Sequence, residues 1–251
     1  MKIKFYPPIL LFLLACLVLV FSNSCGKDDP ADPLSGNCTN AKTTAVFSPA
    51  VIYGSMTDQD GNTYRTVTIG TQTWMAENLR TTKYRDGSDI PLVSVNTEWT
   101  ALTSGGYCNY ENTSNCDTIA TFGRLYNWYA ATDPRNIAPV GWHVPTRAEY
   151  YTLQQYLASI GQSEGALKET GTSHWKSPNT GGTNLSGFTS LPGGVRLLSG
   201  AFADMGTDGN WWSTSITLGY IESLHLYSNS SSAPGGSYHQ NCGLQIRCVK
   251  D

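Results

Sequence analysis

The sequence predicts an α+β fold with antiparallel strands, two main helices and long loops in a single domain. Two stretches with the apolar spacing of helices occupy residues 122–131 and 146–160. Runs in which apolar and polar residues alternate, as in half-buried strands, stand before and after them; the clearest are 64–69, 220–227 and 244–249. Strands and helices do not alternate one by one along the chain, so a parallel β-α-β architecture is not expected.

The domain is expected to begin at about residue 51 with a β-hairpin. Segments 51–53 and 64–69 flank the turn sequence Asp58–Asn62, in which Gly61 supplies the positive φ that a tight hairpin needs. This Asp-rich turn also resembles part of a calcium loop. However, its glycine stands at position 4 instead of 6, and Ile69 replaces the closing glutamate. The pattern therefore favours a plain turn.

The first expected helix covers residues 122–131. Leu125, Trp128 and Tyr129 share one face of it, and Pro134 ends the pattern. We therefore expect this face, Trp128 included, to pack against the core.

The second expected helix, 146–160, is marked more clearly. Thr146 and Glu149 have the spacing of a capping box, in which each side chain bonds the other residue's backbone N–H. Gly161 can end the helix in the left-handed conformation. The apolar face consists of Tyr150, Leu153, Leu157 and Ile160.

Loops and strands are expected beyond this helix. A short helix is expected over 163–169 and a long Gly-, Thr-, Ser- and Asn-rich loop over 171–187. Strands are then predicted over 193–198 and 210–215, before the two C-terminal strands.

Residues 1–24 have the features of a bacterial lipoprotein signal peptide. Lysines precede an apolar run, 9–21, which at 1.5 Å per residue reaches about 20 Å, short of the roughly 30 Å that a spanning helix needs. Ser24 precedes Cys25 and charged residues follow, so we expect cleavage before Cys25 and its acylation, for example with palmitate. Cleavage before Cys16 would leave an exposed apolar N-terminus. Secretory cleavage with Cys25 left as a free thiol is the other alternative.

Residues 25–50 are rich in Asp, Pro, Asn, Thr and Gly and are predicted to form a flexible tether. The acidic residues directly after Cys25 resemble the export signal of bacterial surface lipoproteins. The expected partner of Cys25 is therefore outer-membrane lipid, and the expected location is the outer membrane, facing the cell exterior.

The charge balance argues against nucleic acid as a partner. The chain has 16 Lys and Arg residues against 19 Asp and Glu residues, a net charge of −3. No basic patch of the kind that binds phosphate backbones is evident.

The cysteines indicate at most a few disulfides in an oxidising compartment. Cys108 and Cys116 bracket a polar loop and are the candidate pair. Cys242 and Cys248 would lie roughly 20 Å apart at the ends of one strand, too far for a disulfide.

Catalytic templates are absent from the sequence. The four histidines are scattered, and no zinc-protease motif, nucleophile elbow or phosphate loop occurs. His143 is interpreted as a hydrogen-bonded core or turn residue and Glu149 as a helix cap. We therefore predict a protein that is not an enzyme and that carries no metal and no cofactor.

Several short segments carry a family resemblance. Residues 123–130 read Gly-Arg-Leu-Tyr-Asn-Trp-Tyr-Ala, and 141–146 read Gly-Trp-His-Val-Pro-Thr. The others, in order, are 60–64, 69–79, 187–189, 192–194, 212–215 and 247–251. From about Ser55 to the end, the chain resembles the Fibrobacter succinogenes major paralogous domain. That resemblance implies a secreted or surface lipoprotein without an established activity.

The helix start at Thr146 and the terminal Arg-Cys strand are in turn similar to the formylglycine-generating sulfatase-modifying domain. This similarity implies a C-type-lectin-like fold. Enzymes of that lineage hold copper between two cysteines near the C-terminal strand, and Cys248 stands in a matching context. Cys242 departs from the pattern by one residue, which would turn its side chain to the other face of a strand. Cys248 is then a small buried apolar residue.

The candidate ligand-binding residues are Asp208, Asn210, Trp211 and Trp212. If one of the two indoles faces outward beside Asp and Asn, it forms a platform for a sugar ring. The alternative is that both indoles are core residues. The calcium-binding signatures of lectins are missing.

The sequence thus favours a surface binding or adhesion module for a glycan or protein ligand. The alternatives are a divergent copper-dependent oxidase of the formylglycine-generating lineage and a purely structural envelope or fimbria-associated protein.

Overall fold

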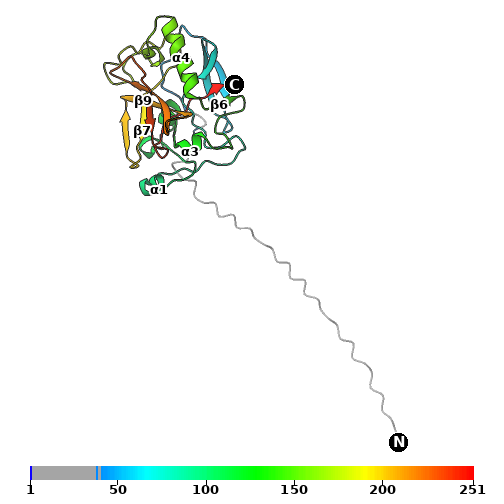
Figure 1. Ribbon diagram of the computed structural model, residues 1–251. Coiled ribbons are helices and arrows are strands. Elements are labelled where there is room, and N and C mark those ends of the chain that lie inside the picture. Colours follow the sequence, from blue (N-terminus) through cyan, green and yellow to red (C-terminus); the bar gives the residue numbers. More distant parts are fainter. Residues whose placement is uncertain (2–37, 39–40) are drawn as a thin grey trace. The chain divides into compact units, whose positions relative to one another are not determined.

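A computed structural model describes residues 1, 38 and 41–251 of the chain (Figure 1). The expected acylation site Cys25, nearly all of the signal peptide and residues 26–37, 39 and 40 of the tether lie outside the described residues. Within the described part of the chain, no helix combines the length and apolar character that a membrane crossing requires.

The N-terminal half contributes most of a five-stranded antiparallel sheet in the order β1-β2-β3-β12-β6. Its strands are β1 (Gly54–Thr57), β2 (Thr63–Ile69), β3 (Gln72–Met75), β6 (Trp142–His143) and β12 (Val249–Lys250). The predicted hairpin is confirmed, with Gly61 at φ 81° in its turn, but its first strand is Gly54–Thr57 instead of residues 51–53. Asp58 accepts hydrogen bonds from the backbone of Asp60 and Asn62 and from the Tyr64 hydroxyl. Both carboxylate oxygens of Asp58 therefore serve to hold the turn.

The first predicted helix is wrong in its extent. Residues 116–131 instead form α2 (Cys116–Phe122), β5 (Leu125–Tyr126) and α3 (Trp128–Ala131). Gly123 ends α2 at φ 74°, ψ −164°, a conformation that glycine adopts readily, and Asn127 caps α3 by accepting from the backbone of Ala130. Between the two helices, β5 pairs with β4 (Tyr107–Cys108). Local capping and strand pairing thus override the helical spacing of the apolar residues.

The second predicted helix is confirmed as α4 (Arg147–Ser159), and both hydrogen bonds of its capping box are formed. Tyr150, Leu153 and Leu157 face the core, and Gly161 follows the helix at φ 71°. The short helix expected next is the 3-10 turn η2 (Glu164–Leu167). As predicted, residues 171–187 contain neither helix nor strand. Two further short elements are α1 (Asn96–Thr100) and η1 (Tyr110–Asn112).

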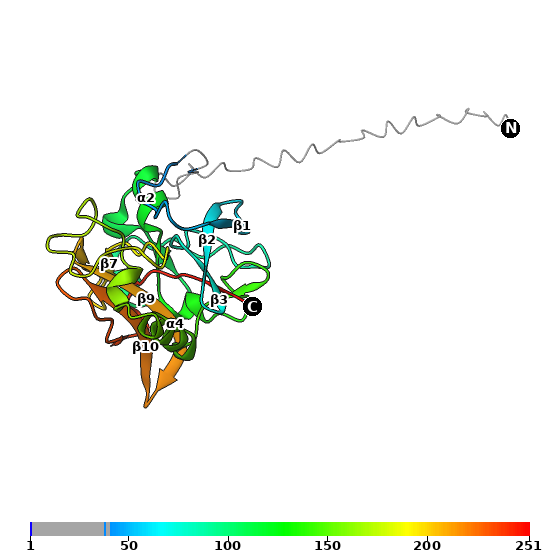
Figure 2. The same cartoon turned by 90° about the horizontal axis from the view of Figure 1, so that it is seen from above.

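The C-terminal half adds two smaller antiparallel sheets. One contains β9 (Asp208–Thr217), β10 (Tyr220–Tyr227) and β11 (Gly236–Tyr238), and the other contains β7 (Gly193–Arg196) and β8 (Phe202–Met205). In Figure 2, the outer end of the β9–β10 hairpin projects from the body of the domain, and α4 lies between this hairpin and β3.

Two core clusters cover both faces of the β9–β10 sheet. The first cluster includes Met75, Tyr126 and Trp212. The second cluster joins Trp74 of β3, α4 and Trp211. Because side chains alternate along a strand, neighbouring tryptophans enter different clusters, and neither reaches solvent.

The C-terminal segment departs from the predicted strand 244–249, since only Val249 and Lys250 form regular ladder pairs. Leu244 bridges to Tyr126, and Gln245 bridges to Trp211. This extended segment therefore joins the separate sheets instead of lengthening one of them. The observed elements confirm an α+β fold built mainly from antiparallel strands.

The end of the expected tether, residues 41–50, is bound to the domain, which corrects the prediction for that part. The backbone N–H of Lys42 donates to Asp117 (3.0 Å), that of Thr44 to the Thr121 hydroxyl (3.0 Å) and that of Val46 to Glu169 (2.5 Å). The guanidinium of Arg65 covers the ring of Phe47 at 4.0 Å. We call residues 41–53 the strap. Phe47, Val51 and Tyr53 of the strap pack against the second core cluster, and its backbone is held by polar side chains of the domain.

Candidate functional site

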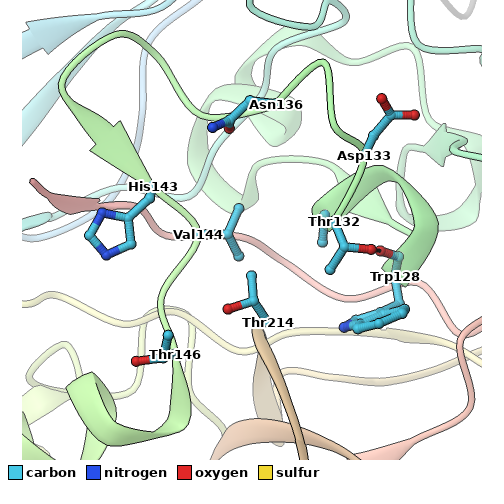
Figure 3. A pocket seen from close by; sticks show the side chains of 9 residues that line it. Trp128, Thr132, Asp133, Asn136, His143, Val144, Thr146 and Thr214 are labelled. Carbon is cyan, nitrogen blue, oxygen red and sulfur yellow. Dashed lines mark hydrogen bonds between the residues drawn. The ribbon is translucent and has the colours of Figure 1, made fainter.

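A pocket of about 480 Å³ opens where α3, β6, the start of α4 and β9 meet (Figure 3). Its lining residues are Trp128, Ala131, Thr132, Asp133, Asn136, His143, Val144, Thr146 and Thr214. The cap residues Asn127 and Thr146 fix the first turns of α3 and α4 and so position two of its walls.

Trp128 supplies the aromatic wall of the pocket. It is the first residue of α3 and is half-buried, with its ring packed against the first cluster. The indole Nε1–H donates to the backbone carbonyl of Ser213 on β9, at 3.1 Å. This bond fixes the orientation of the ring while part of it stays open to the pocket.

Asp133 stands in the loop after α3 as one half of an ion pair. Its two carboxylate oxygens accept from Nε and Nη2 of Arg135, at 2.9 and 2.8 Å. These hydrogen bonds hold the pKa of Asp133 below its ordinary value, so the carboxylate is ionised and paired. The guanidinium also lies over the ring of Tyr84, at 3.9 Å.

His143 is held between two carboxylates. Its Nε2 lies 2.6 Å from Oε1 of Glu149, and its Nδ1 lies 2.7 Å from Oδ1 of Asp251. Partial burial opposes a charge on the ring, but the bonds to Asp251 and Glu149 outweigh it and raise the pKa of His143. When the ring is protonated, both of its nitrogens donate to these carboxylates, so neither is left to accept a proton from a ligand.

This arrangement predicts that stability falls as the pH rises. The pKa of His143 is raised above about 6.5, so the ion pairs contribute fully below that pH and are lost as the pH rises through the folded-state pKa. Because the ring is a third exposed, we expect a loss of about 1 kcal/mol between pH 6 and pH 9. Urea unfolding of wild type and His143→Gln at several pH values measures this loss of stability.

The free energy of unfolding of His143→Gln should fall less between pH 6 and pH 9 than that of wild type. His239→Gln, which replaces an exposed histidine, is the control and should follow wild type. The same pH dependence in all three proteins would contradict the assignment.

None of the four ligand-binding residues predicted from the sequence lines this pocket, which corrects that prediction. Trp211 and Trp212 are both fully buried, as is Asn210, whose side chain accepts from the Tyr238 hydroxyl at 3.2 Å. Asp208 is partly exposed at the start of β9. The alternative that both indoles are core residues is confirmed, because both faces of β9 are covered and no exposed platform exists there.

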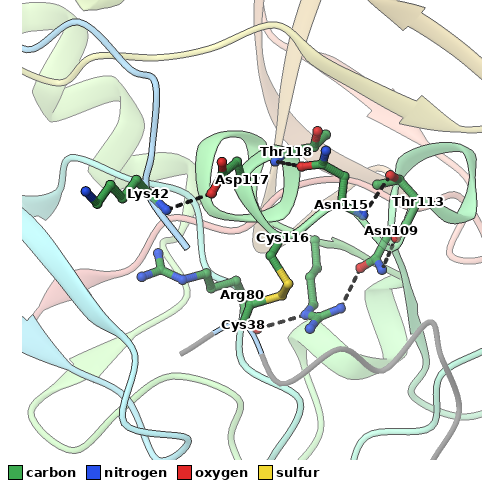
Figure 4. Close-up of a disulfide and its surroundings, with 10 residues drawn as sticks. Cys38, Lys42, Arg80, Asn109, Thr113, Asn115, Cys116, Asp117 and Thr118 are labelled. Carbon is green, nitrogen blue, oxygen red and sulfur yellow. Dashed lines mark hydrogen bonds between the residues drawn. A yellow bond between two sulfur atoms is a disulfide. The ribbon is translucent and has the colours of Figure 1, made fainter. Parts of the chain in front are cut away.

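The predicted Cys108–Cys116 pair is also wrong. The disulfide joins Cys38 to Cys116, with 5.2 Å between the Cα atoms (Figure 4). Cys116 opens α2 beside the strap, whereas Cys108 is a free thiol buried with Trp99 and Leu125 in a third cluster. Nearness in the sequence favoured the wrong partner, because the turn between the two residues directs them to different sides.

Cys242 and Cys248 are free and buried within the first cluster. Burial raises the pKa of both thiols, which keeps them protonated. The interpretation of Cys248 as a small buried residue is confirmed. Among the described residues, no group of three or more His, Cys, Asp or Glu side chains is placed to hold a metal ion.

The sequence interpretation placed Trp128 in a helix core and did not single out Asp133, Asn136 or Thr214. A signal for the pocket was nevertheless present. Three of the segments that carry the family resemblance, 123–130, 141–146 and 212–215, each contribute to its lining. Their convergence depends on the fold and could not be seen from their spacing.

The comparisons agree with that resemblance. The chain belongs to the Fibrobacter succinogenes major domain family, whose model matches residues 67–250. No curated protein and no solved structure matches the chain significantly.

Proposed function

We propose that this protein is an outer-membrane lipoprotein, anchored through acylated Cys25 and exposed on the cell surface. Its domain is a non-catalytic binding or adhesion module for a glycan or protein ligand, with a fold similar to that of C-type lectins. The observation that carries the proposal is the pocket, in which an oriented indole and several polar side chains from separate elements face one space.

The state of the polar groups supports binding over turnover. The imidazole of His143 and the carboxylate of Asp133 are engaged by protein partners. A general base needs a free acceptor within reach of its substrate, and a nucleophile needs such a base beside it. Both nitrogens of protonated His143 are engaged by carboxylates, and both oxygens of Asp133 are engaged by Arg135.

The disulfide supports the extracytoplasmic part of the proposal. Disulfides persist in oxidising compartments, and Cys38 of this disulfide belongs to the expected tether. It would join the tether to the domain at α2.

Acylation of Cys25 is tested by metabolic labelling with an alkyne fatty acid, and exposure on the cell surface is tested by protease treatment of intact cells. A Cys25→Ser variant that is labelled as strongly as wild type would contradict the anchor.

The surroundings of Cys242 and Cys248 do not support the alternative of a copper-dependent oxidase. Thiolate ligands to copper must be deprotonated, and burial raises the thiol pKa of both Cys242 and Cys248. Cys248 also packs against Met75, whose sulfur accepts from the Cys248 backbone at 3.3 Å.

Ligand binding is tested with residues 26–251 on arrays of glycans and surface proteins. Trp128→Ala removes the aromatic wall and should weaken binding at least about tenfold. Tyr220→Ala is the matched control, because Tyr220 is 65% exposed on the β9–β10 hairpin and does not line the pocket. If no ligand is found, a purely structural role is favoured. If Trp128→Ala binds like wild type, the ligand does not occupy this pocket.

A further inference from the structure

The charged groups around the pocket are already satisfied by protein partners. Arg135 engages both oxygens of Asp133. Glu149 binds His143 through Oε1, and its Oε2 accepts from the backbone and hydroxyl of Thr146, at 2.7 and 2.8 Å. An acidic ligand would meet no unpaired cation among the lining residues, and a basic ligand would compete with Arg135 for Asp133. The pocket therefore suits an uncharged ligand.

The polar groups that stay open are neutral. The Asn136 side chain uses its oxygen to accept from the backbone of Ala138, and no bond to another described residue engages its amide N–H groups. The Thr132 hydroxyl donates to the carbonyl of Trp128 at 2.9 Å, which leaves its oxygen free to accept. The Thr214 hydroxyl reaches the Pro145 carbonyl only at 3.5 Å. Amide donors and hydroxyl acceptors thus surround the same space (Figure 3).

The lining residues with apolar side chains are Trp128, Ala131 and Val144. The indole of Trp128 is the largest apolar surface among them. A pyranose ring has a face of C–H groups and a rim of hydroxyls that both donate and accept. An apolar wall with neutral polar groups at its edge matches both features.

We infer that the ligand of this pocket is an uncharged saccharide whose ring lies against Trp128 and whose hydroxyls bond Asn136 and Thr132. This inference rests on the proposed function and narrows its ligand class. A peptide is the less suitable occupant, because the apolar wall is small and the pocket offers no unpaired charge.

The test uses residues 26–251 with paired oligosaccharides, each neutral chain matched to a chain of the same length that carries carboxylate or sulfate groups. Titration calorimetry and saturation-transfer NMR measure binding. Asn136→Asp is the key variant. It retains the oxygen that accepts from Ala138 and tolerates the left-handed backbone (φ 61°), but it replaces the amide donor with a negative charge.

We expect the neutral chains to bind and the charged chains to bind at least about tenfold more weakly. Asn136→Asp should weaken neutral binding about three- to tenfold, and Trp128→Ala more, while Tyr220→Ala leaves it unchanged. If the charged chains bind instead, and Trp128→Ala abolishes their binding, the inference of an uncharged saccharide is overturned and the proposed function stands. If nothing binds in any panel, the proposed function fails. Neutral binding that neither pocket variant changes overturns the assignment of the ligand to this pocket.

Discussion

Replacing Cys38 and Cys116 together with serine is expected to lower the free energy of unfolding by up to about 4.5 kcal/mol. The two residues are 78 positions apart, and closing a loop of that length removes a large conformational entropy from the unfolded chain. The figure is an upper value, because the strap keeps its hydrogen bonds to Asp117, Thr121 and Glu169 when the disulfide is absent.

Urea unfolding of the oxidised protein, the reduced protein and the double variant measures this effect. The double variant is its own control, since a reducing agent should change the midpoint of wild type and leave that of the variant unchanged. Peptide mapping under non-reducing conditions checks the connectivity. A Cys108–Cys116 peptide, or equal midpoints for oxidised and reduced wild type, would refute the assignment.

Hydrogen exchange should show which part of the protein loses stability first when the disulfide is removed. Without the disulfide, the amides of Lys42, Thr44 and Val46 are held only by single bonds to side chains. They should exchange faster, whereas the amides of α4 should not change.

The elements that the sequence predicted well are those whose ends are fixed by local chemistry. Thr146 and Glu149 form their capping box within four residues, and Gly61 lies within the turn that it shapes. No distant contact is needed to place either element. The helix expected over 122–131 failed for the opposite reason, since the pairing of Leu125 with Cys108 competes with the helical spacing.

The site was harder to predict, because burial depends on what covers each face. Alternation correctly separated Trp211 from Trp212, but only the tertiary structure shows that Trp74 and Tyr150 cover one side and Tyr126 the other. In the same way, Trp128 satisfied the pattern of a core residue, and its open face results from the break between β5 and α3. The partner of Cys116 lies outside the matched family region, 67–250, so the motifs could not indicate it.

Arg247 is the second residue whose replacement should have a large effect. It is 1% exposed, and it lies in the C-terminal segment that joins the sheets. Its guanidinium donates to the Asn78 side chain at 2.7 Å and to the carbonyls of Phe188 and Thr189, and it lies 4.4 Å from the centre of the Phe188 ring. Burial lowers its pKa to about 9, so it remains charged at pH 7.

Arg247→Met keeps most of the apolar volume but removes all of these donors. The carbonyls of Phe188 and Thr189 would be left buried without these partners, which costs about 1–3 kcal/mol for each group. Loss of the buried charge offsets part of this cost, so we expect a net loss of about 3 kcal/mol. Arg247→Lys, which retains the charge but not the planar set of donors, should fall between this variant and wild type.

Denaturant unfolding followed by circular dichroism measures the effect. Lys42→Met is the matched control, because Lys42 is exposed and only its backbone N–H bonds the domain. The free energy of unfolding of this variant should stay within about 0.5 kcal/mol of wild type. If Arg247→Met does not fold well enough to measure, Arg247→Lys still provides the comparison. A loss below about 1 kcal/mol in Arg247→Met would mean that the C-terminal segment is held by its backbone bridges. The guanidinium would then be dispensable, and the junction between the sheets would not depend on it.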